Sequence, residues 1–541
     1  MTNFADSSER HKRMIPCYLR PRLAWLYHSF SSSLLSLLRT FIFQVNQFWI
    51  ELGYFITLSS LGFLALKASK PRTARSFKPK YIDLFFTSVS ASTVSSMSTV
   101  EMEVFSNTQL VFLTVLMFVG GEVFTSMLGL HLMRARIINR RTNNILNSEP
   151  NSQSLPQSDS NTDHIELRMI TDHNFTEEKS NTKQEEEGNL KLKSIKILAY
   201  LVSCYLLVVH VTVSSLISIY LSLIPSAKRV LKTKGLKIET FSIFTTVSTF
   251  SNCGFIPTNE NMVVLKKNSG LLLILIPQIL MGNTLYPVCL RLSIWFMEKF
   301  TKRSEFRYML KNSRKLGYGH LLSGKHCFYL ANTALGFIVL QLAIFCVLHW
   351  NADAIGGLNA YQKLVGSLFQ VVNSRHAGES VVDLSSISPA ILVLFVVMMY
   401  LPPYTSYLPI SEEDDIGPHK KEKNTIKKRN IWELLLFSQL TYLVIFVILI
   451  CITERNHMKR DPLNFSVLNV VIEVISAYGN VGFSSGYSCK RQIHPDSQCK
   501  DAWYGFVGKW SDVGKFLLIV VMFFGRLKKF STRGGKFWSL A

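Results

Sequence analysis

Four short stretches of this chain decide its fold: ASTVSSM (91–97), STFSNCGF (248–255), NSRHAGES (373–380) and SAYGNVGF (476–483). Each lies between two long apolar runs and ends in a turn, at Ser96, Gly254, Gly378 or Gly482. One such turn is typical of an ordinary helix cap. Four of them between paired apolar runs instead indicate hairpins that dip partway into a membrane around one axis. This pattern predicts an ion pathway.

The four stretches also align with one another. Three of them place a serine six residues before the turn residue and a bulky apolar residue directly after it. The serines are Ser90, Ser248 and Ser476, with Val372 as the exception, and the apolar residues are Met97, Phe255 and Phe483, with Glu379 as the exception. We therefore expect four repeated units and a pseudo-four-fold axis within a single chain.

The composition is that of a polytopic membrane protein. Hydrophobic residues make up 48% of the 541 residues and charged residues only 18%, and the mean hydropathy is positive. About 20 consecutive apolar residues span a bilayer. Eight runs are predicted to do so, at 41–66, 110–133, 195–224, 270–296, 330–350, 389–409, 434–452 and 513–524. The predicted fold is all-α, with eight transmembrane helices and four re-entrant pore loops.

These runs divide the chain into four units, each made of a span, a pore loop and a second span. The expected units cover 41–133, 195–297, 326–411 and 431–527. The connecting segments are a cytoplasmic N-terminus at 1–40 without a signal peptide, a polar loop at 134–194 predicted to be disordered, basic cytoplasmic loops at 298–325 and 412–430, and a cytoplasmic C-terminus at 528–541.

The net charge of +23 raises the question of nucleic-acid binding. The basic residues cluster beside the predicted spans, at 299–315, 419–429 and 526–536. This is the positive-inside pattern, and it favours anionic lipid over nucleic acid as the partner. Two basic loops that the topology places outside, 67–80 and 228–237, fit that rule badly.

Two features of the predicted outer loops allow two readings each. Among nine cysteines, Cys489 and Cys499 flank a polar loop, where they either form a disulfide or remain free thiols. Glu101 and Glu103 follow the first turn, where they either concentrate cations at the pore mouth or form a solvated face.

The sequons at Asn174 and Asn464 are not expected to carry glycans, because Asn174 lies in the predicted cytoplasmic loop and Asn464 lies beside a re-entrant helix.

A glycine at such a turn has a direct use in ion selection. A cation that loses its water needs a ring of oxygen atoms, which backbone carbonyls supply when the chain adopts conformations closed to residues with a Cβ. We therefore predict a selectivity filter at Ser96, Gly254, Gly378 and Gly482, where the transported Na⁺ would be bound by carbonyl oxygens. No cofactor is expected.

Several longer motifs carry a family resemblance. They are TVSSMSTVEMEVFSNTQL (93–110), TFSNCGF (249–255), GNTLYPVCLR (282–291), SAYGNVGFSSGYSCKRQ (476–492) and MFFGRLKKF (522–530). Together they resemble the plant high-affinity potassium transporter (HKT) family of the Trk/Ktr/HKT superfamily. The resemblance covers the membrane portion of the chain, but not the N-terminus or the segment 143–189.

The resemblance implies a passive path for Na⁺ or K⁺ across the plasma membrane, with both termini in the cytoplasm, and a homodimer. Family members with serine at the first filter position are predominantly Na⁺-selective, and those with glycine there also transport K⁺. Ser96 places this chain with the Na⁺-selective class. The alternative is a K⁺ or mixed Na⁺/K⁺ transporter of the same family.

Charged residues near the filter are predicted to support it. A charge inside a membrane is costly enough to require a partner. We expect Arg375 and Glu379, which flank the third turn, to pair with each other, and Glu473 to pair with Lys509 or Lys515.

The second helices of the units share breakers below the filter: Gly120-Gly121, Gly282, Pro402-Pro403 and Gly525. Pro402 and Pro403 are predicted to interrupt the third unit and form a gate at 401–404. In the family that the chain resembles, an arginine matching Arg526 lies along the conduction path. We therefore expect Arg526 to be an electrostatic barrier.

Other functions fit the sequence less well. The chain lacks a nucleotide-binding Gly-Lys-Ser/Thr loop and a His-Glu-x-x-His motif, so an enzyme is not predicted. No span carries a basic residue at every third position, as a voltage sensor would. The potassium-translocating subunit of an ATP-driven pump shares the four-unit plan, but it would require an ATPase partner.

Overall fold

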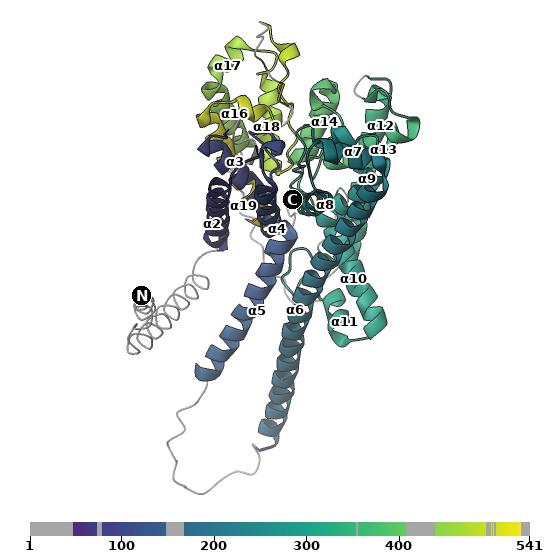
Figure 1. Cartoon of the computed structure of the whole chain (residues 1–541). Coiled ribbons are helices and arrows are strands. Elements are labelled where there is room, and N and C mark those ends of the chain that lie inside the picture. Colours follow the sequence, from purple (N-terminus) through teal and green to yellow (C-terminus); the bar gives the residue numbers. More distant parts are fainter. Residues whose placement is uncertain are drawn as a thin grey trace, which may run out of the picture. The chain divides into compact units, whose positions relative to one another are not determined.

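The computed structural model describes residues 47–72, 78–147, 167–352, 355–406, 439–493, 499, 501–502 and 505–531. Within these ranges every regular element is a helix, and the one strand-like pairing is an isolated bridge between Tyr487 and Ala502 (Figure 1). The all-α prediction is therefore confirmed for the described residues. The predicted segments 1–40 and 412–430 and residues 532–541 lie outside them.

The α-helices are α2 (Gln47–Ala68), α3 (Tyr81–Ser92), α4 (Asn107–Gly120), α5 (Glu122–Asn147), α6 (Leu167–Leu223), α7 (Pro225–Thr233), α8 (Ile238–Ser251), α9 (Ser269–Gly282), α10 (Tyr286–Thr301), α11 (Ser304–Lys311), α12 (Gly324–His349), α13 (Ala360–Asn373), α14 (Pro389–Tyr400), α16 (Gln439–Thr453), α17 (Arg455–Arg460), α18 (Val467–Gly479) and α19 (Asp512–Ser531). Short 3-10 helices are η2 (Met102–Val104), η3 (Asn261–Leu265), η5 (Leu384–Ser386), η7 (Cys489–Arg491) and η8 (Phe506–Lys509).

The chain divides into two units, Met1–Tyr54 and Phe55–Ala541. Of the first unit, the structure describes only residues 47–54, which begin α2. The second unit holds the rest of α2 and all other described helices, and it contains the four turns identified from the sequence.

Several helices have the length and composition of membrane spans. Among the described residues, three helical segments qualify, Phe48–Ala68, Glu186–Leu223 and Gly324–His349, and the number rises to five if two bent helix pairs each count as one span. The bent pairs are α4 with α5, at 53°, and α9 with α10, at 85°. The predicted runs 110–133 and 270–296 are thus broken rather than straight. The breaks follow Gly120 and Gly282, the glycines singled out from the sequence.

Part of the segment that we predicted to be disordered is helical. The prediction covered 134–194, but α5 continues to Asn147 and α6 already begins at Leu167, while 148–166 lie outside the described residues. The helical part after residue 166 contains Glu and Lys at several positions, and both residues have good helix propensity. Low hydrophobicity of the segment therefore did not exclude a helix.

Glycines let the second helices approach the turns closely. A Cβ added at Gly120 would collide with the carbonyl oxygen of Ser92, one at Gly282 with that of Phe250, and one at Gly525 with that of Tyr478. Each carbonyl belongs to the residue four positions before a turn residue. The same contact therefore recurs in three units. The prediction that Gly525 breaks its helix is wrong, because α19 continues through Gly525.

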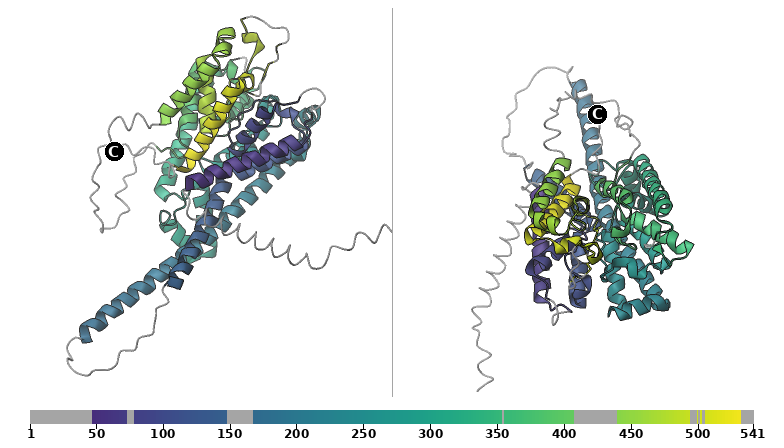
Figure 2. Two further views of the ribbon diagram at one scale, coloured as in Figure 1. Left: turned by 90° about the vertical axis from the view of Figure 1, so that its left-hand side faces the viewer. Right: turned by 90° about the horizontal axis from the view of Figure 1, so that it is seen from above.

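The first and last parts of the described chain lie side by side. Helix α19 contacts both α3 and α18. In the views of Figure 2, α19 is yellow, α3 is purple and α18 is yellow-green. A buried cluster fills this region, with Phe86 of α3, Val474 of α18 and Leu518 of α19 among its members. Burial of such side chains stabilises the contact by about 1.5–3 kcal/mol for each one.

Two ion pairs also join α3 to α19. Lys515 Nζ lies 2.8 Å from Asp83 Oδ1, and the two side chains are only 5% and 9% exposed. Lys80 Nζ lies 3.9 Å from Asp512 Oδ1, with both side chains largely exposed. A buried pair differs from an exposed one because removing one partner leaves an uncompensated charge inside the protein.

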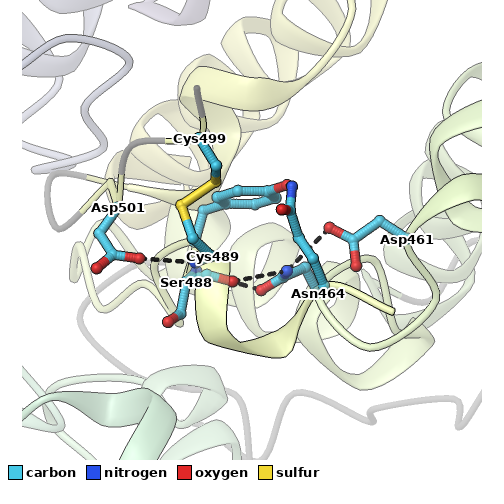
Figure 3. Close-up of a disulfide and its surroundings, with 8 residues drawn as sticks. Asp461, Asn464, Ser488, Cys489, Cys499 and Asp501 are labelled. Carbon is cyan, nitrogen blue, oxygen red and sulfur yellow. Dashed lines mark hydrogen bonds between the residues drawn. A yellow bond between two sulfur atoms is a disulfide. The ribbon is translucent and has the colours of Figure 1, made fainter. Parts of the chain in front are cut away.

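A disulfide closes the polar loop after the fourth turn. Cys489 and Cys499 are bonded, with their Cα atoms 5.9 Å apart (Figure 3), which decides between the two readings of the sequence. Beside it, the buried Asn464 donates from Nδ2 to Asp461 Oδ2 at 2.8 Å and to the carbonyl oxygen of Ser488 at 3.0 Å. The Asn464 amide is thus enclosed in the fold, consistent with an unglycosylated sequon.

Gly525→Ala is expected to lower the melting temperature of the purified protein in detergent. The new methyl group would push α19 away from Tyr478, and overpacking of this kind costs about 1–3 kcal/mol. Gly336→Ala on α12 is the matched control, because an added Cβ there meets nothing within 4 Å. That control should be neutral or stabilising. A Gly525→Ala protein as stable as the wild type would contradict the close-packing explanation.

Lys515→Met is expected to reduce the free energy of unfolding by about 3–5 kcal/mol, because Asp83 would remain buried without its partner. Lys80→Met, at the exposed pair between the same two helices, should cost less than about 1 kcal/mol. Thermal unfolding of the two variants side by side measures the difference. Equal destabilisation by both would show that the buried pair has no special weight.

Candidate functional site

Each of the four turns follows a short, largely buried helix. Helices α3, α8, α13 and α18 end three to five residues before the predicted filter residues. At all four positions the backbone is left-handed, with φ of 55° at Ser96, 81° at Gly254, 68° at Gly378 and 97° at Gly482. A serine in this conformation is strained by roughly 1–2 kcal/mol, whereas a glycine is not. The shared φ gives the four turns one backbone geometry.

The four turn residues are neighbours in space. A Cβ added at Gly254 would collide with the Ala377 carbonyl oxygen, and it would lie 3.1 Å from Ser96 Oγ. A Cβ added at Gly378 would lie 2.9 Å from the carbonyl carbon of Gly482. One added at Gly482 would collide with Ser96 Cβ. Each turn therefore contacts the next one along the chain, and the fourth turn contacts the first. The four turns form a closed ring.

The serine six residues before the turn has a structural role in three units. Its carbonyl oxygen accepts a hydrogen bond from the amide just before the turn residue, and this bond folds the chain back on the helix end. The bonds are Ser95 N to Ser90 O at 2.8 Å, Cys253 N to Ser248 O at 2.9 Å and Val481 N to Ser476 O at 3.0 Å.

The third turn, which lacks that serine, is built differently. The amide of Gly378 donates to the carbonyl oxygen of Asn373 at 3.2 Å, and the amide of Glu379 donates to Asn373 Oδ1 at 3.1 Å. Asn373 thus takes over the role of the serine carbonyl. The sequence exceptions at Val372 and Glu379 mark a real departure from the other three turns.

Arg375 and Glu379 have different partners rather than the mutual pair that we predicted. Arg375 donates from one guanidinium nitrogen to the carbonyl oxygens of Pro402, at 2.6 Å, and Pro403, at 3.2 Å. Glu379 is fully buried and accepts a 2.6 Å hydrogen bond from Thr249 Oγ1 of the second turn. The arginine therefore ties the third turn to the break after α14, and the glutamate ties it to the second turn.

Glu473 also has partners other than those predicted. Its Oε1 accepts from Ser484 Oγ at 2.5 Å and from the Ser485 amide at 3.2 Å, both just beyond the fourth turn. Lys515 is instead paired with Asp83, and Lys509 Nζ lies 5.0 Å from the centre of the Tyr487 ring. Spacing along the chain could not separate these choices, because hydroxyl and amide groups can also donate hydrogen bonds to a buried carboxyl group.

Arg526 is buried near the C-terminal end of α19. It is 1% exposed, and one guanidinium nitrogen donates to the carbonyl oxygen of Gly120, at the break between α4 and α5, at 2.5 Å. Its guanidinium carbon also lies 5.5 Å from the centre of the Phe55 ring. At this burial Arg526 is not an exposed side chain that extends to the membrane surface.

The acidic residues after the first turn are held by the loop before α8 and the loop after the second turn. Glu103 lies 2.7 Å from Lys234 Nζ and accepts from the Asn259 amide at 3.1 Å, and Glu101 accepts from Asn259 Nδ2 at 3.1 Å. Burial lowers the pKa of Lys234, but its bonds to Glu103 and Glu260 outweigh this effect, so the pKa is raised overall. The positive charge of Lys234 is thus paired with two carboxylates, whereas the poor fit of this basic loop to the positive-inside rule stands.

The sequence did not predict that Tyr404, in the break after α14, contacts His320. Tyr404 and His320 Nδ1 share a 2.6 Å hydrogen bond, and the His320 ring packs against Tyr286 and Tyr318. It also missed Asp83 as the partner of Lys515. A carboxylate within a helix otherwise made of apolar and hydroxyl residues was the available signal for Asp83. His320 lies in a polar loop and gave no comparable signal.

Comparison with known proteins identifies the family. Residues 172–533 match the family model TrkH, described as a cation transport protein. The chain is 49% identical over 512 residues to a rice (Oryza sativa subsp. japonica) protein named Cation transporter HKT1;3, covering 92% of each chain. It is 50% identical over 483 residues to the Arabidopsis thaliana protein named Sodium transporter HKT1, covering 88% of this chain and 92% of that protein.

The fold has a counterpart among solved structures. The crystal structure of the potassium transporter TrkH from Vibrio parahaemolyticus superposes with a TM-score of 0.50, covering 90% of this chain and 83% of that one at 13% sequence identity. At this identity the likeness concerns the fold alone. The sequence matches and the fold agree, and the chain therefore belongs to the HKT branch of the TrkH family of cation transport proteins.

Proposed function

We propose that the chain is a passive, sodium-selective cation transporter that conducts Na⁺ through the ring formed by Ser96, Gly254, Gly378 and Gly482. The closed ring of four left-handed turn residues is the observation that carries this proposal. Such a backbone can turn its carbonyl oxygens toward a common axis and replace the water of a cation. Irregular backbone at membrane depth is tolerated where it lines a path for water or ions.

We propose further that the chain consists of four span–pore loop–span units around one pore. Three glycine contacts support this plan, because each joins a second helix to the carbonyl four residues before a turn residue. The recurring amide-to-serine hydrogen bonds support it as well. The third unit keeps the plan with different side chains.

Selectivity for sodium rests on Ser96. Of the four ring residues, only Ser96 carries a side chain, and that side chain lies against the ring glycines on both sides. A side chain at one of four positions restricts the backbone and makes the oxygen ring less symmetric. We expect this to impair full coordination of K⁺ more than passage of partly hydrated Na⁺. The relative named as a sodium transporter supports the same choice.

Arg526 and the break at Pro402 and Pro403 are proposed as the barrier below the ring. Arg526 holds a positive charge in the protein interior at the α4–α5 break, where it would repel a cation. The carbonyl oxygens of Pro402 and Pro403 are held by Arg375, three residues before Gly378. A movement of this break would therefore be transmitted directly to the third turn.

Glu379, Glu473 and Lys509 are proposed as supports rather than ion ligands. Glu379 bridges the third turn to Thr249, and Glu473 holds the residues after Gly482. Lys509 contributes at a distance, by packing over Tyr487. A plasma-membrane location, cytoplasmic termini and a homodimer complete the proposal, and these rest on the family.

The first test is two-electrode voltage clamp on oocytes that express this chain alone. Replacing external K⁺ with Na⁺ should shift the reversal potential to positive values, and changing K⁺ in the absence of Na⁺ should have little effect. Ser96→Gly should raise the relative K⁺ permeability, because all four ring residues would then lack a side chain. Equal shifts with both ions in the wild type would favour a mixed Na⁺/K⁺ transporter. An unchanged permeability ratio in Ser96→Gly would remove Ser96 from the selectivity mechanism.

Arg526→Gln should increase the Na⁺ conductance several-fold, since the substitution removes a buried positive charge while keeping similar bulk. Arg307→Gln is the control, because Arg307 is a 65% exposed arginine on α11 paired with Glu298. Currents are normalised to the amount of protein at the cell surface. If Arg526→Gln conducts no better than Arg307→Gln, Arg526 is not a barrier.

A further inference from the structure

The carboxamide of Asn480 crosses from the fourth turn to the first. Its Nδ2 donates a 2.7 Å hydrogen bond to Ser95 Oγ, and the two residues are 385 positions apart in the sequence. Two longer bonds from the same nitrogen reach the carbonyl oxygens of Ala477, at 3.3 Å, and of Met522 on α19, at 3.4 Å. Asn480 is 2% exposed and Ser95 is fully buried. The bond therefore lies in the protein interior, where it is not weakened by competing water.

The bond belongs to a chain of hydrogen-bonded hydroxyl groups that leads to α3, the helix before the first turn. Ser95 Oγ lies 2.7 Å from Thr93 Oγ1, and Thr93 Oγ1 donates to the carbonyl oxygen of Val89 at 2.7 Å. Because Thr93 uses its single proton on Val89, Ser95 must donate to Thr93 and accept from Asn480. One orientation satisfies every hydroxyl in the chain. This polarity fixes the position of Ser95.

The second turn offers a natural comparison at Asn252. Asn252 and Asn480 both lie two residues before a ring glycine, and both are left-handed, with φ of 58° and 50°. Asparagine tolerates this backbone better than most residues do, which explains both positions. Asn252 Nδ2, however, donates to Phe250 within its own turn, at 3.2 Å. The residue of the third turn that corresponds to Ser95 is Ala377, which has no hydroxyl group.

The crossing bond lies beside the contact between Ser96 and Gly482. Ser95 immediately precedes Ser96, and Asn480 is two residues before Gly482. Ser96 Oγ would lie 2.6 Å from a Cβ at Gly482, so the serine side chain packs directly on this glycine. Ser96 is also strained by its positive φ. A strained residue keeps its place only when its surroundings hold it there.

We infer that Asn480 is a specificity-determining positioning residue. By holding Ser95 it keeps the Ser96 side chain in the ring and so maintains the preference for sodium. This inference rests on the proposed role of Ser96 and adds a second residue to it. Asn480 acts through Ser95 and does not itself contact the ion.

The test compares Asn480→Gly with Asn252→Gly in oocytes. Glycine accepts the left-handed backbone at both sites, so each substitution removes only a carboxamide. Asn480→Gly should raise the K⁺-to-Na⁺ permeability ratio by about three- to tenfold, which is the effect expected from losing the buried hydrogen bond to Ser95. Asn252→Gly should retain the wild-type ratio. The readout is the reversal potential, which does not depend on how much protein reaches the surface.

Ser95→Ala removes the other end of the same bond and serves as a second variant. It should shift the ratio in the same direction as Asn480→Gly, because both substitutions delete the bond between the two turns. The double variant should shift the ratio by less than the sum of the two single shifts. A wild-type ratio in either single variant overturns the inference, as does an equal shift in Asn252→Gly. The inference is also overturned if both single variants reach the cell surface but carry no Na⁺ current. The bond would then be required for conduction itself and not for selectivity.

Ser96→Gly separates this inference from the proposed function. If Ser96→Gly raises K⁺ permeability and Asn480→Gly does not, the ring proposal stands and the role of Asn480 fails. If Ser96→Gly leaves the ratio unchanged, the assignment of selectivity to Ser96 fails first. Each result therefore points to one of the two claims.

Discussion

The structure depends on one constraint, which is that irregular backbone inside a membrane protein must have its polar groups enclosed and satisfied by the protein itself. The four turns depart from helical hydrogen bonding where the helices before them end. Each turn is therefore folded back onto the end of its own helix by a short amide-to-carbonyl bond. The second helices then close over the turns, and glycines at Gly120, Gly282 and Gly525 allow them to come near enough.

The four turns are alike in plan and unequal in chemistry. Three use a serine carbonyl as the anchor, and the third uses Asn373. A hydrogen bond between Glu379 and Thr249 joins the third turn to the second. A hydrogen bond between Asn480 and Ser95 joins the fourth turn to the first. A single chain can vary each position independently, which a pore built from four identical subunits cannot do. Ser96 uses this freedom by placing one side chain in a ring of glycines.

The charged groups inside the fold connect the ring to its surroundings. Arg375 reaches the break after α14, Arg526 reaches the break after α4, and Lys515 joins α19 to α3 through Asp83. Each of these contacts joins segments that are distant in the sequence. A buried charge without a partner is destabilising, so each contact also favours one arrangement of the helices over others. The same buried charges that stabilise the fold therefore also specify which helices pack against one another.

The sequence by itself determined the all-helical class, the positions of the four turns and the family. These follow from local patterns: apolar runs long enough to cross a bilayer, glycines at matched places and motifs read along the chain. It also identified the third turn as the exception, through Val372 and Glu379.

Only the tertiary structure decided the partners. Arg375 and Glu379 are four residues apart and were expected to pair, yet they face different segments. Lys515 binds Asp83, which lies 432 residues away. Asn480 and Asn252 occupy equivalent places with the same backbone, and only the tertiary structure shows that Asn480 reaches a neighbouring turn. The physical reason is that a local pattern fixes backbone shape and burial, whereas the partner of a buried polar group depends on which distant segment is packed against it.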